Sequence, residues 1–209
     1  IGAGSEETSM SFNIAIDGPA GAGKSTIAKK IAKELGFVYV DTGAMYRAMA
    51  LYFLRSNISN EDEQAISRAS ENVEITIQYE NGEQQVFLNG ENVSGEIRKE
   101  EVGNMASKTS GYGQVRKKLV ELQQQLAKKA DVVMDGRDIG TVVLPDAQVK
   151  VYLTASVATR AKRRYDELSE KGQECNLEKI EADIEQRDYQ DMHRENSPLR
   201  QAEDATLVD

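Results

Sequence analysis

The segment Gly18–Ser25, with the sequence GPAGAGKS, constrains this chain more than any other feature. It follows the apolar run Phe12–Ile16 and matches the pattern G-x-x-x-x-G-K-[ST] of a phosphate-binding loop. In such a loop, a strand leads into glycines whose backbone folds around an anion, and the next helix points its first N–H groups at phosphates. Lys24 is placed to reach the β- and γ-phosphates, and the Ser25 hydroxyl to bind Mg²⁺. The segment therefore predicts binding of a nucleoside triphosphate.

Apolar segments after the loop alternate with amphipathic helices. The helix that follows the loop is expected to end at Gly36, a typical C-cap residue. Further strands are expected at Phe37–Val40, Val132–Met134, Val149–Leu153 and Thr206–Val208. This alternation predicts a parallel sheet with helices on both faces. The expected fold class is therefore α/β, a P-loop fold in which helices flank five parallel strands.

The stretch 73–93 departs from that alternation. Its first residues alternate between apolar and polar, and two Asn-Gly pairs, at 81–82 and 89–90, are typical of tight hairpin turns. These features predict a small antiparallel three-stranded insert. Residues 57–101 hold eleven acidic and three basic side chains and so carry most of the net charge of −9. Two interpretations of the insert remain open: a decorative β-element, and a mobile flap that closes over a second substrate.

Composition excludes several classes of protein. A net charge of −9 argues against a protein that coats nucleic acid, and no apolar run is as long as a membrane span. The lone Cys175 excludes an internal disulfide and is typical of a reducing cytosol. We expect a cytoplasmic monomer without nucleic-acid or membrane partners. Residues 1–9 are small and polar, which favours a tag remnant ahead of a start at Met10.

Three arginines gather on one predicted helix. Arg160, Arg163 and Arg164 fall at i, i+3 and i+4, which places their guanidinium groups on one helix face. Such a cluster is most often a solvated surface. This helix follows an expected strand and precedes Gly172, a position that suits a short helical lid over a triphosphate.

Five segments of the chain form a specific combination. They are GPAGAGKST (Gly18–Thr26), DTGAMYR (Asp41–Arg47), VSGEIR (Val93–Arg98), MDGRDIGTVV (Met134–Val143) and RDYQDMHR (Arg187–Arg194). The combination resembles the bacterial cytidylate kinase family, over about residues 10–209. The resemblance implies an enzyme of pyrimidine metabolism that transfers the γ-phosphoryl group of ATP to CMP or dCMP, with Mg²⁺ as cofactor. It also implies a core of residues 10–56 and 102–209, a lid at about 156–172, and a nucleotide-monophosphate-binding insert at 57–101.

The phosphate-loop pattern, which does not depend on the resemblance, and the resemblance together predict the ATP side of the site. The ATP phosphates are expected at Gly18, Pro19, Ala20, Gly21, Ala22, Gly23, Lys24, Ser25 and Thr26. The expected catalytic residues are Lys24, Arg137, Arg160, Arg163 and Arg164. Because phosphoryl transfer requires little covalent chemistry from a protein, these residues would act through positioning and charge stabilisation.

The resemblance also implies an acceptor site for CMP. Its expected residues are Thr42, Arg47, Ser107, Arg116, Arg137, Asp138, Arg187, Asp191 and Arg194. Arg47 and Arg137 would hold the CMP phosphate, because a planar guanidinium can bind two oxygens at once. Arg187 and Asp191 would hold the sugar hydroxyls, and Arg194 would reach the phosphate or the base.

The base is expected to be read by Ser107, Arg116 and Asp138, with Thr42 near the cytosine. Cytosine presents an N4 donor beside the N3 and O2 acceptors, which suits a carboxylate acceptor together with Arg or Ser donors. Uracil presents O4 in place of the amine. A site built on polar pairing rejects the wrong base because its buried groups are then left unpaired.

Two acidic residues have open roles. Asp135 closes an apolar strand, as the acidic residue of a Walker B segment does. It is either a ligand to an Mg²⁺-bound water or a structural partner of the loop. Asp17, directly before the loop, carries the same ambiguity.

Two other classes of function compete with this interpretation. Another small-molecule P-loop kinase would act on UMP, AMP, dTMP or shikimate, but the insert and the segment Asp135–Asp138 (DGRD) disfavour it. A GTP switch or a regulatory nucleotide-binding module would bind nucleotide without phosphorylating an acceptor. A GTPase would carry N-K-x-D to bind guanine, and this sequence has no such tetrapeptide.

Overall fold

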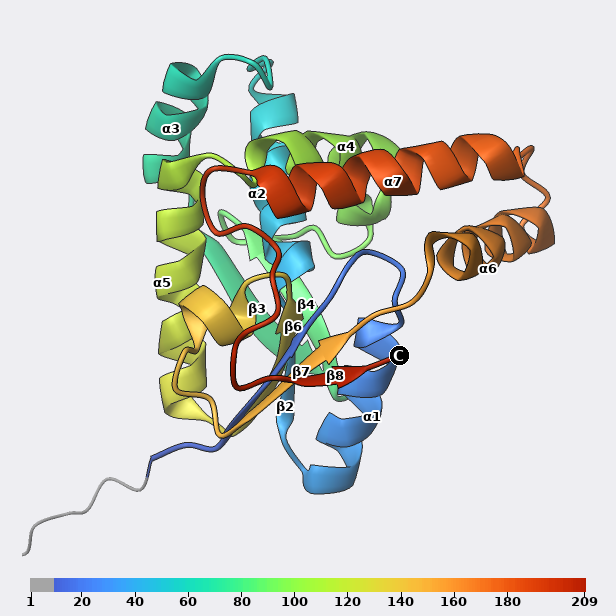
Figure 1. The fold of residues 1–209 in the computed structure, drawn as a ribbon. Helices are drawn as coiled ribbons and strands as arrows, with labels where there is room; N and C mark the ends of the chain where they lie inside the picture. Colours follow the sequence, from blue (N-terminus) through green and yellow to red (C-terminus); the bar gives the residue numbers. More distant parts are fainter. Residues whose placement is uncertain (1–9) are drawn as a thin grey trace, which may run out of the picture.

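The computed structural model describes residues 10–209 (Figure 1), so the expected tag remnant at residues 1–9 lies outside the described residues. Five parallel strands form the central sheet, in the order β2-β6-β1-β7-β8. These strands are β1 (Asn13–Asp17), β2 (Val38–Asp41), β6 (Val132–Gly136), β7 (Val149–Leu153) and β8 (Thr206–Val208). The expected α/β fold with a five-stranded parallel sheet is confirmed.

Helices connect the strands. They are α1 (Lys24–Leu35), α2 (Thr42–Arg55), α3 (Glu63–Glu71), α4 (Glu100–Thr109), α5 (Gly113–Lys129), α6 (Val157–Glu170) and α7 (Leu177–His193). Of these, α1 and α2 pack directly against the central sheet. A 3-10 turn spans Glu96–Arg98, and a π-helical turn spans Ile139–Val143. The C-cap of α1 is Gly36, as predicted: its φ is 70°, and its N–H donates to the Ala32 carbonyl.

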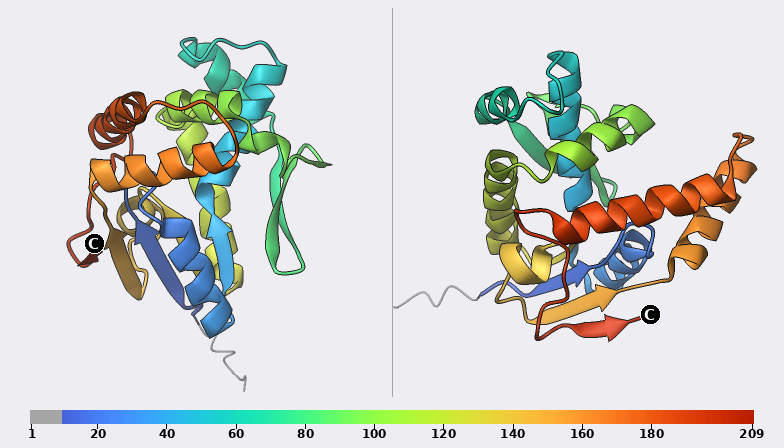
Figure 2. Two further views of the ribbon diagram at one scale, coloured as in Figure 1. Left: turned by 90° about the vertical axis from the view of Figure 1, so that its right-hand side faces the viewer. Right: turned by 45° about the horizontal axis from the view of Figure 1, so that its top comes forward.

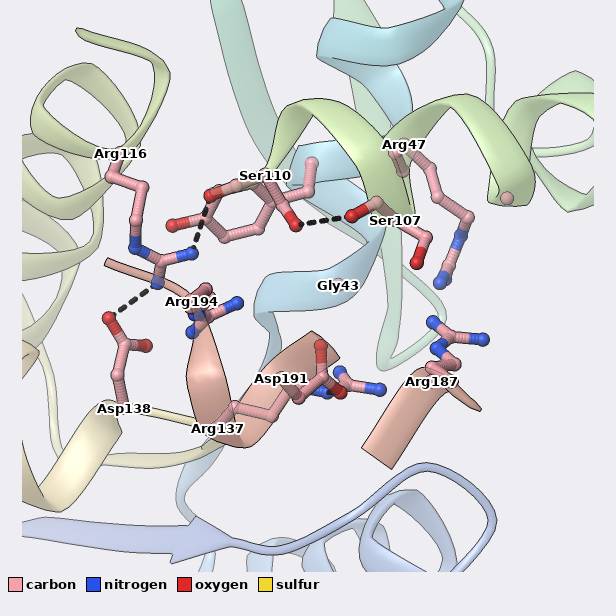
Figure 3. Close-up of a pocket in the computed structure, with 13 residues that line it drawn as sticks. Gly43, Arg47, Ser107, Ser110, Arg116, Arg137, Asp138, Arg187, Asp191 and Arg194 are labelled. Carbon is pink, nitrogen blue, oxygen red and sulfur yellow. Dashed lines mark hydrogen bonds and ion pairs between the residues drawn. The ribbon is translucent and has the colours of Figure 1, made fainter. Parts of the chain in front are cut away.

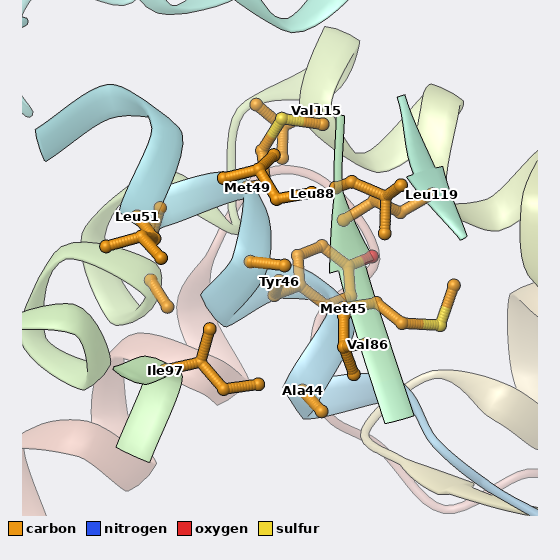
Figure 4. Packing of buried hydrophobic residues seen from close by; sticks show 14 of the residues in the cluster. Ala44, Met45, Tyr46, Met49, Leu51, Val86, Leu88, Ile97, Val115 and Leu119 are labelled. Atoms are coloured by element: carbon orange, nitrogen blue, oxygen red, sulfur yellow. The ribbon is translucent and has the colours of Figure 1, made fainter. Parts of the chain in front are cut away.

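The alternation of side chains along β1 divides the core into two parts. Ile14 and Ile16 pack with Ala28 and Ala32 of α1 on one face of the sheet. Ala15 points to the other face and joins a larger cluster that includes α2, α4 and α5. Figure 4 shows part of this larger cluster, with side chains of α2 packed against those of α5 and of the insert. Because α2 is buried on several sides, the side chains that it carries toward the site are held firmly.

The predicted insert is a three-stranded antiparallel sheet, β3 (Ile75–Glu80), β4 (Glu83–Leu88) and β5 (Glu91–Asn92). All four residues of its two Asn-Gly turns have positive φ, between 48° and 84°, which favours Asn and Gly in tight hairpins. Figure 2 shows the β3–β4 hairpin beside the central sheet. The Gln84 side chain pairs with both backbone groups of Asp41, at 2.9 and 3.1 Å, and so fixes the hairpin to β2.

α6 and α7 form a helical hairpin beyond β7, and α7 crosses the upper part of the molecule in Figure 1 and extends to the right. The helix that carries Arg187 and Asp191 ends at His193, so Arg194 follows this helix rather than belonging to it. The division of the chain into core, insert and lid stays a prediction. None of the helices within residues 10–209 is long and apolar enough to cross a membrane.

Candidate active site

The phosphate loop lies between β1 and α1, as its sequence predicts. Gly21 and Gly23 adopt left-handed φ values of 75° and 91°, which residues with a Cβ rarely adopt. Gly23 is also the N-cap of α1, and it has no side chain to bond the first N–H groups of the helix. Those N–H groups and the positive end of the helix dipole are therefore available to an anion.

Gly18 is required by close packing against β7. A Cβ added at Gly18 would lie 2.0 Å from the Leu153 carbonyl oxygen, which is part of the backbone and cannot rotate away. We predict that Gly18→Ala lowers the free energy of unfolding by about 1–3 kcal/mol and weakens ATP binding, because the loop must shift. Urea unfolding and calorimetry with an ATP analogue measure the two effects.

Gly95→Ala is the matched control for this prediction. A Cβ at Gly95 would meet no atom within 4 Å, and its φ of −79° is ordinary for alanine. It should change the free energy of unfolding by less than about 0.5 kcal/mol. Equal effects of the two substitutions would show that Gly18 is not constrained in this way.

The Lys24 side chain folds back onto the phosphate loop. Its Nζ donates to the carbonyl oxygens of Gly18 and Pro19, at 2.8 and 2.9 Å. Burial, followed by repulsion from Arg137, lowers the pKa of Lys24. Burial, followed by repulsion from Asp41, raises the pKa of Asp135, whose carboxylate accepts a hydrogen bond from the Tyr39 hydroxyl at 2.8 Å. The lysine and this carboxylate thus lie in one poorly hydrated region beside the loop.

Asp17 binds the π-helical turn. Its two carboxylate oxygens accept hydrogen bonds from the N–H groups of Ile139 and Gly140, at 2.8 and 2.7 Å. Burial raises the pKa of Asp17 to about 6, and the two backbone hydrogen bonds oppose that rise. Asp17 therefore has a structural role, because its carboxylate joins the end of β1 to the segment that follows β6.

A pocket lies between α2, α4, α5, α7 and the end of β6, and Figure 3 shows its lining. It contains eight of the nine predicted acceptor residues: Arg47, Ser107, Arg116, Arg137, Asp138, Arg187, Asp191 and Arg194. The ninth, Thr42, is buried beside it and donates its hydroxyl to the Asp135 carbonyl at 2.7 Å. The lining residues that sequence reasoning missed are Gly43, Tyr46, Gly103, Ala106 and Ser110. Of these, Gly43 and Tyr46 had a usable signal, because both lie inside the DTGAMYR segment.

The pocket contains a buried ion pair, Arg116 with Asp138 (Figure 3). The two side chains are only 6% and 4% exposed. Arg116 also donates to the Ser110 carbonyl at 2.8 Å, and its guanidinium carbon lies 4.9 Å from the centre of the Tyr46 ring. Three buried atoms of lining residues, Arg116 Nε, the Tyr46 hydroxyl and an Arg194 Nη, have no hydrogen-bond partner within residues 10–209. Buried polar atoms are normally paired, so this pocket suits a polar ligand.

Arginine dominates the rest of the pocket. Asp191 accepts a hydrogen bond from the Nε of Arg137 at 2.8 Å, and its negative charge also acts on Arg187 and Arg194. Loss of hydration, then repulsion from Arg137, lowers the pKa of Arg187 to about 10. Loss of hydration, then repulsion from Arg116, lowers the pKa of Arg194 to about 10. Both of these pKa values lie well above 7, so Arg187 and Arg194 are charged at neutral pH and favour an anion in the pocket.

The three arginines of α6 do not share one environment. Arg160 is buried and donates to the Ala20 carbonyl of the phosphate loop at 3.2 Å. Arg163 lies near the loop, with one Nη 3.9 Å from where a Cβ of Gly23 would be. Arg164 instead forms an exposed ion pair with Glu167, at 3.4 Å. The structure brings two of the three predicted lid arginines to the phosphate loop.

The oxygen donors near the loop fit a magnesium ion that arrives with a nucleotide. Within residues 10–209 there is no group of three or more His, Cys, Asp or Glu side chains that could hold a metal. Mg²⁺ commonly keeps several waters and binds one or two carboxylates together with substrate phosphates. The exposed hydroxyl of Ser25 and the buried carboxylate of Asp135 are the donors that such an ion would use, directly or through water.

Comparisons with known proteins agree with the resemblance seen in the motifs. The model of the family described as cytidylate kinase matches residues 14–209. The cytidylate kinase of Lactobacillus johnsonii is 54% identical over 95% of this chain and 86% of its own length. Those of Caldicellulosiruptor saccharolyticus and Streptococcus sanguinis are each 53% identical, over 95% of this chain and 88% of their own length. A match of this extent covers the phosphate loop, the insert, the pocket and the α6–α7 hairpin, and the chain therefore belongs to the cytidylate kinase family.

Proposed function

We propose that this chain transfers the γ-phosphoryl group of Mg²⁺-bound ATP to CMP or dCMP and releases ADP with CDP or dCDP. The observation that carries this proposal is the arginine-lined pocket, which contains a buried Arg116–Asp138 pair and whose Arg137 and Asp191 lie near enough to Lys24 of the phosphate loop to influence its pKa. A nucleoside monophosphate kinase needs two anion sites next to each other, one for each phosphate chain. Family membership supports the same reaction.

The phosphate loop would hold the donor. Its backbone N–H groups would bind the ATP phosphates, and Lys24 would exchange its bonds to the loop carbonyls for bonds to the β- and γ-phosphates. Ser25 would bind Mg²⁺, with Asp135 held near it through water. When bound, Mg²⁺ neutralises charge on the phosphate oxygens.

The pocket would hold the acceptor. Arg47 and Arg137 would bind the CMP phosphate, and Arg187 and Asp191 would hold the sugar hydroxyls. Arg194 would reach the phosphate or the base. Asp191 already orients Arg137 through its Nε, which leaves the outer nitrogens of that guanidinium free to bind phosphate oxygens.

Base recognition would fall to Ser107, Arg116 and Asp138. Asp138 has the acceptor oxygens that the cytosine amine requires, and Arg116 has an unpaired buried Nε. Arg116 and Asp138 are both buried, so water cannot replace a hydrogen bond that a bound base fails to make with them. A base that leaves a hydrogen-bonding group of either side chain unpaired would therefore bind weakly. This arrangement favours cytosine over uracil, whose O4 cannot donate to a carboxylate.

The reaction would proceed by in-line attack of a CMP phosphate oxygen on the γ-phosphorus of ATP. The new oxygen–phosphorus bond forms as the bond to the β-phosphate oxygen breaks, and ADP leaves. No general base is required, because the acceptor phosphate is already an anion. Lys24, Arg137 and Arg163 would stabilise charge on the transferred group, and closure of the α6–α7 hairpin would exclude water, which would otherwise accept the phosphoryl group.

An ATP-coupled assay over a panel of acceptors tests this proposal. With CMP, dCMP, UMP, AMP, dTMP and shikimate offered separately, we expect turnover with CMP or dCMP to exceed all the others. Equal turnover of AMP and CMP would contradict the base-reading role of Arg116 and Asp138. ATP binding without any product would favour a regulatory nucleotide-binding module.

Arg187 provides a prediction specific to the acceptor. It forms no ion pair within residues 10–209, so its removal leaves no buried charge behind. We expect Arg187→Ala to weaken CMP binding by about tenfold or more, the loss of one charge-assisted hydrogen bond, while ATP binding is largely kept. Calorimetry with each nucleotide measures both. Arg68→Ala, an exposed arginine on α3, is the control, and equal losses for ATP and CMP would contradict the assignment.

A further inference from the structure

One ion pair links the two helices of the α6–α7 hairpin. Arg160 on α6 donates through Nη1 and Nη2 to the two carboxylate oxygens of Asp188 on α7, at 2.9 and 2.6 Å. The two side chains are 4% and 14% exposed. A bidentate pair of this kind is directional as well as strong, because two parallel hydrogen bonds fix the orientation of both groups. It therefore holds α7 in one position against α6.

The same guanidinium also holds the phosphate loop. Its Nη1 donates to the Ala20 carbonyl at 3.2 Å, and its Nε donates to the Ala155 carbonyl at 2.9 Å. The carbon atoms of the Arg160 side chain lie 3.7–3.9 Å from the place that a Cβ of Gly21 would occupy. Arg160 is thus in contact with the loop, with the segment before α6, and with α7. Arg160 therefore connects the phosphate loop to α7.

Asp188, the α7 partner of Arg160, lies next to the acceptor pocket. Asp188 directly follows Arg187, and Asp191 lies one helical turn later on α7. Arg187 and Asp191 line the pocket, whereas neither Arg160 nor Asp188 does. Asp191 in turn fixes Arg137 at the end of β6. A continuous set of contacts therefore runs from the phosphate loop through Arg160 and Asp188 to the pocket.

We propose that Arg160 and Asp188 are positioning residues that couple the two nucleotide sites. This inference rests on the proposed function, in which the loop binds ATP and the pocket binds CMP. A triphosphate that orders the loop would also fix Arg160, and Arg160 would hold α7 where Arg187 and Asp191 meet the acceptor. Each nucleotide would then raise the affinity for the other, since coupling between two sites is reciprocal.

Calorimetry of CMP binding with and without a non-hydrolysable ATP analogue and Mg²⁺ measures this coupling. For the unaltered chain, we expect the analogue to tighten CMP binding by about fivefold or more, the usual size of such coupling. Asp188→Asn keeps the shape of the side chain but removes its charge and one acceptor. In this variant the ratio of the two CMP affinities should fall toward one, while the analogue alone binds with little change. A purely structural role would lower the melting temperature and leave the ratio unchanged.

Two further variants make the test decisive. Glu167→Gln breaks the exposed Arg164–Glu167 pair on the same helix and should leave the ratio as it is. The double variant Arg160→Met with Asp188→Leu removes both charges, so no buried charge is stranded, and it should fold but lose the coupling. A ratio of one in the unaltered chain, or an unchanged ratio in Asp188→Asn, would overturn the coupling alone. A chain that binds the ATP analogue but no CMP would instead overturn the proposed function.

Discussion

Replacing Lys24 with alanine should lower kcat for phosphoryl transfer by about 10²–10³-fold while the fold stays intact, because a positioned charge at the transferred group is lost. The Lys24 ammonium group bonds only loop carbonyl oxygens, so its removal breaks no ion pair within residues 10–209. Its lowered pKa reflects a poorly hydrated place, where a charge acts on phosphate more strongly than in water. Initial rates at saturating ATP and CMP measure the loss, and thermal unfolding monitors the fold.

Lys30→Ala is the matched control for Lys24→Ala. Lys30 is exposed further along the same helix, so its replacement should leave kcat unchanged. If the Lys24 variant retained the kcat of the unaltered chain, the phosphate role of this lysine would be wrong. A loss confined to the KM for ATP would mean that Lys24 binds the ground state without stabilising the transition state.

Asp138→Ala should have the largest effect on stability. Its removal leaves the Arg116 guanidinium buried without an opposite charge, which typically costs about 3–5 kcal/mol of unfolding free energy. We expect CMP binding to fail as well, because the acceptor for the cytosine amine is gone. Urea unfolding measures the first effect, and calorimetry on the remaining folded protein measures the second.

Glu91→Gln serves as the control for Asp138→Ala. It weakens an exposed ion pair with Arg55, which should contribute less than about 1 kcal/mol. If Asp138→Ala destabilised the chain no more than this control does, the claim that Asp138 compensates a buried charge on Arg116 would be wrong. A stable variant that still prefers CMP to UMP would also remove Asp138 from base recognition.

The local features of this fold could be predicted from the sequence because short segments determine them. Glycines at positive φ form the loop, and Asn-Gly pairs form the hairpins of the insert, whatever the rest of the chain does. The alternation of apolar strands with helices was enough to predict a five-stranded parallel sheet. Each of these inferences depends on residues within a few positions of each other.

The pocket could not be derived in the same way, because its residues come from four helices and the end of β6. Its composition was predicted only from the resemblance of motifs to a family. The partner of Asp191 could not be predicted from local spacing either. Helical spacing favours an ion pair between Arg187 and Asp191, yet Asp191 pairs with Arg137. The three arginines of α6 share a helix face by spacing, but packing of α7 buries Arg160 and leaves Arg164 exposed.

Phosphorus NMR of a mixture of ATP, Mg²⁺, CMP and the purified chain follows both phosphate chains at once. If the loop and the arginine-lined pocket form one site, CDP and ADP will accumulate at equal rates, and ATP will remain stable when CMP is left out. Accumulation of ADP and inorganic phosphate without CDP, or no turnover of ATP at all, would contradict a direct transfer between the two sites.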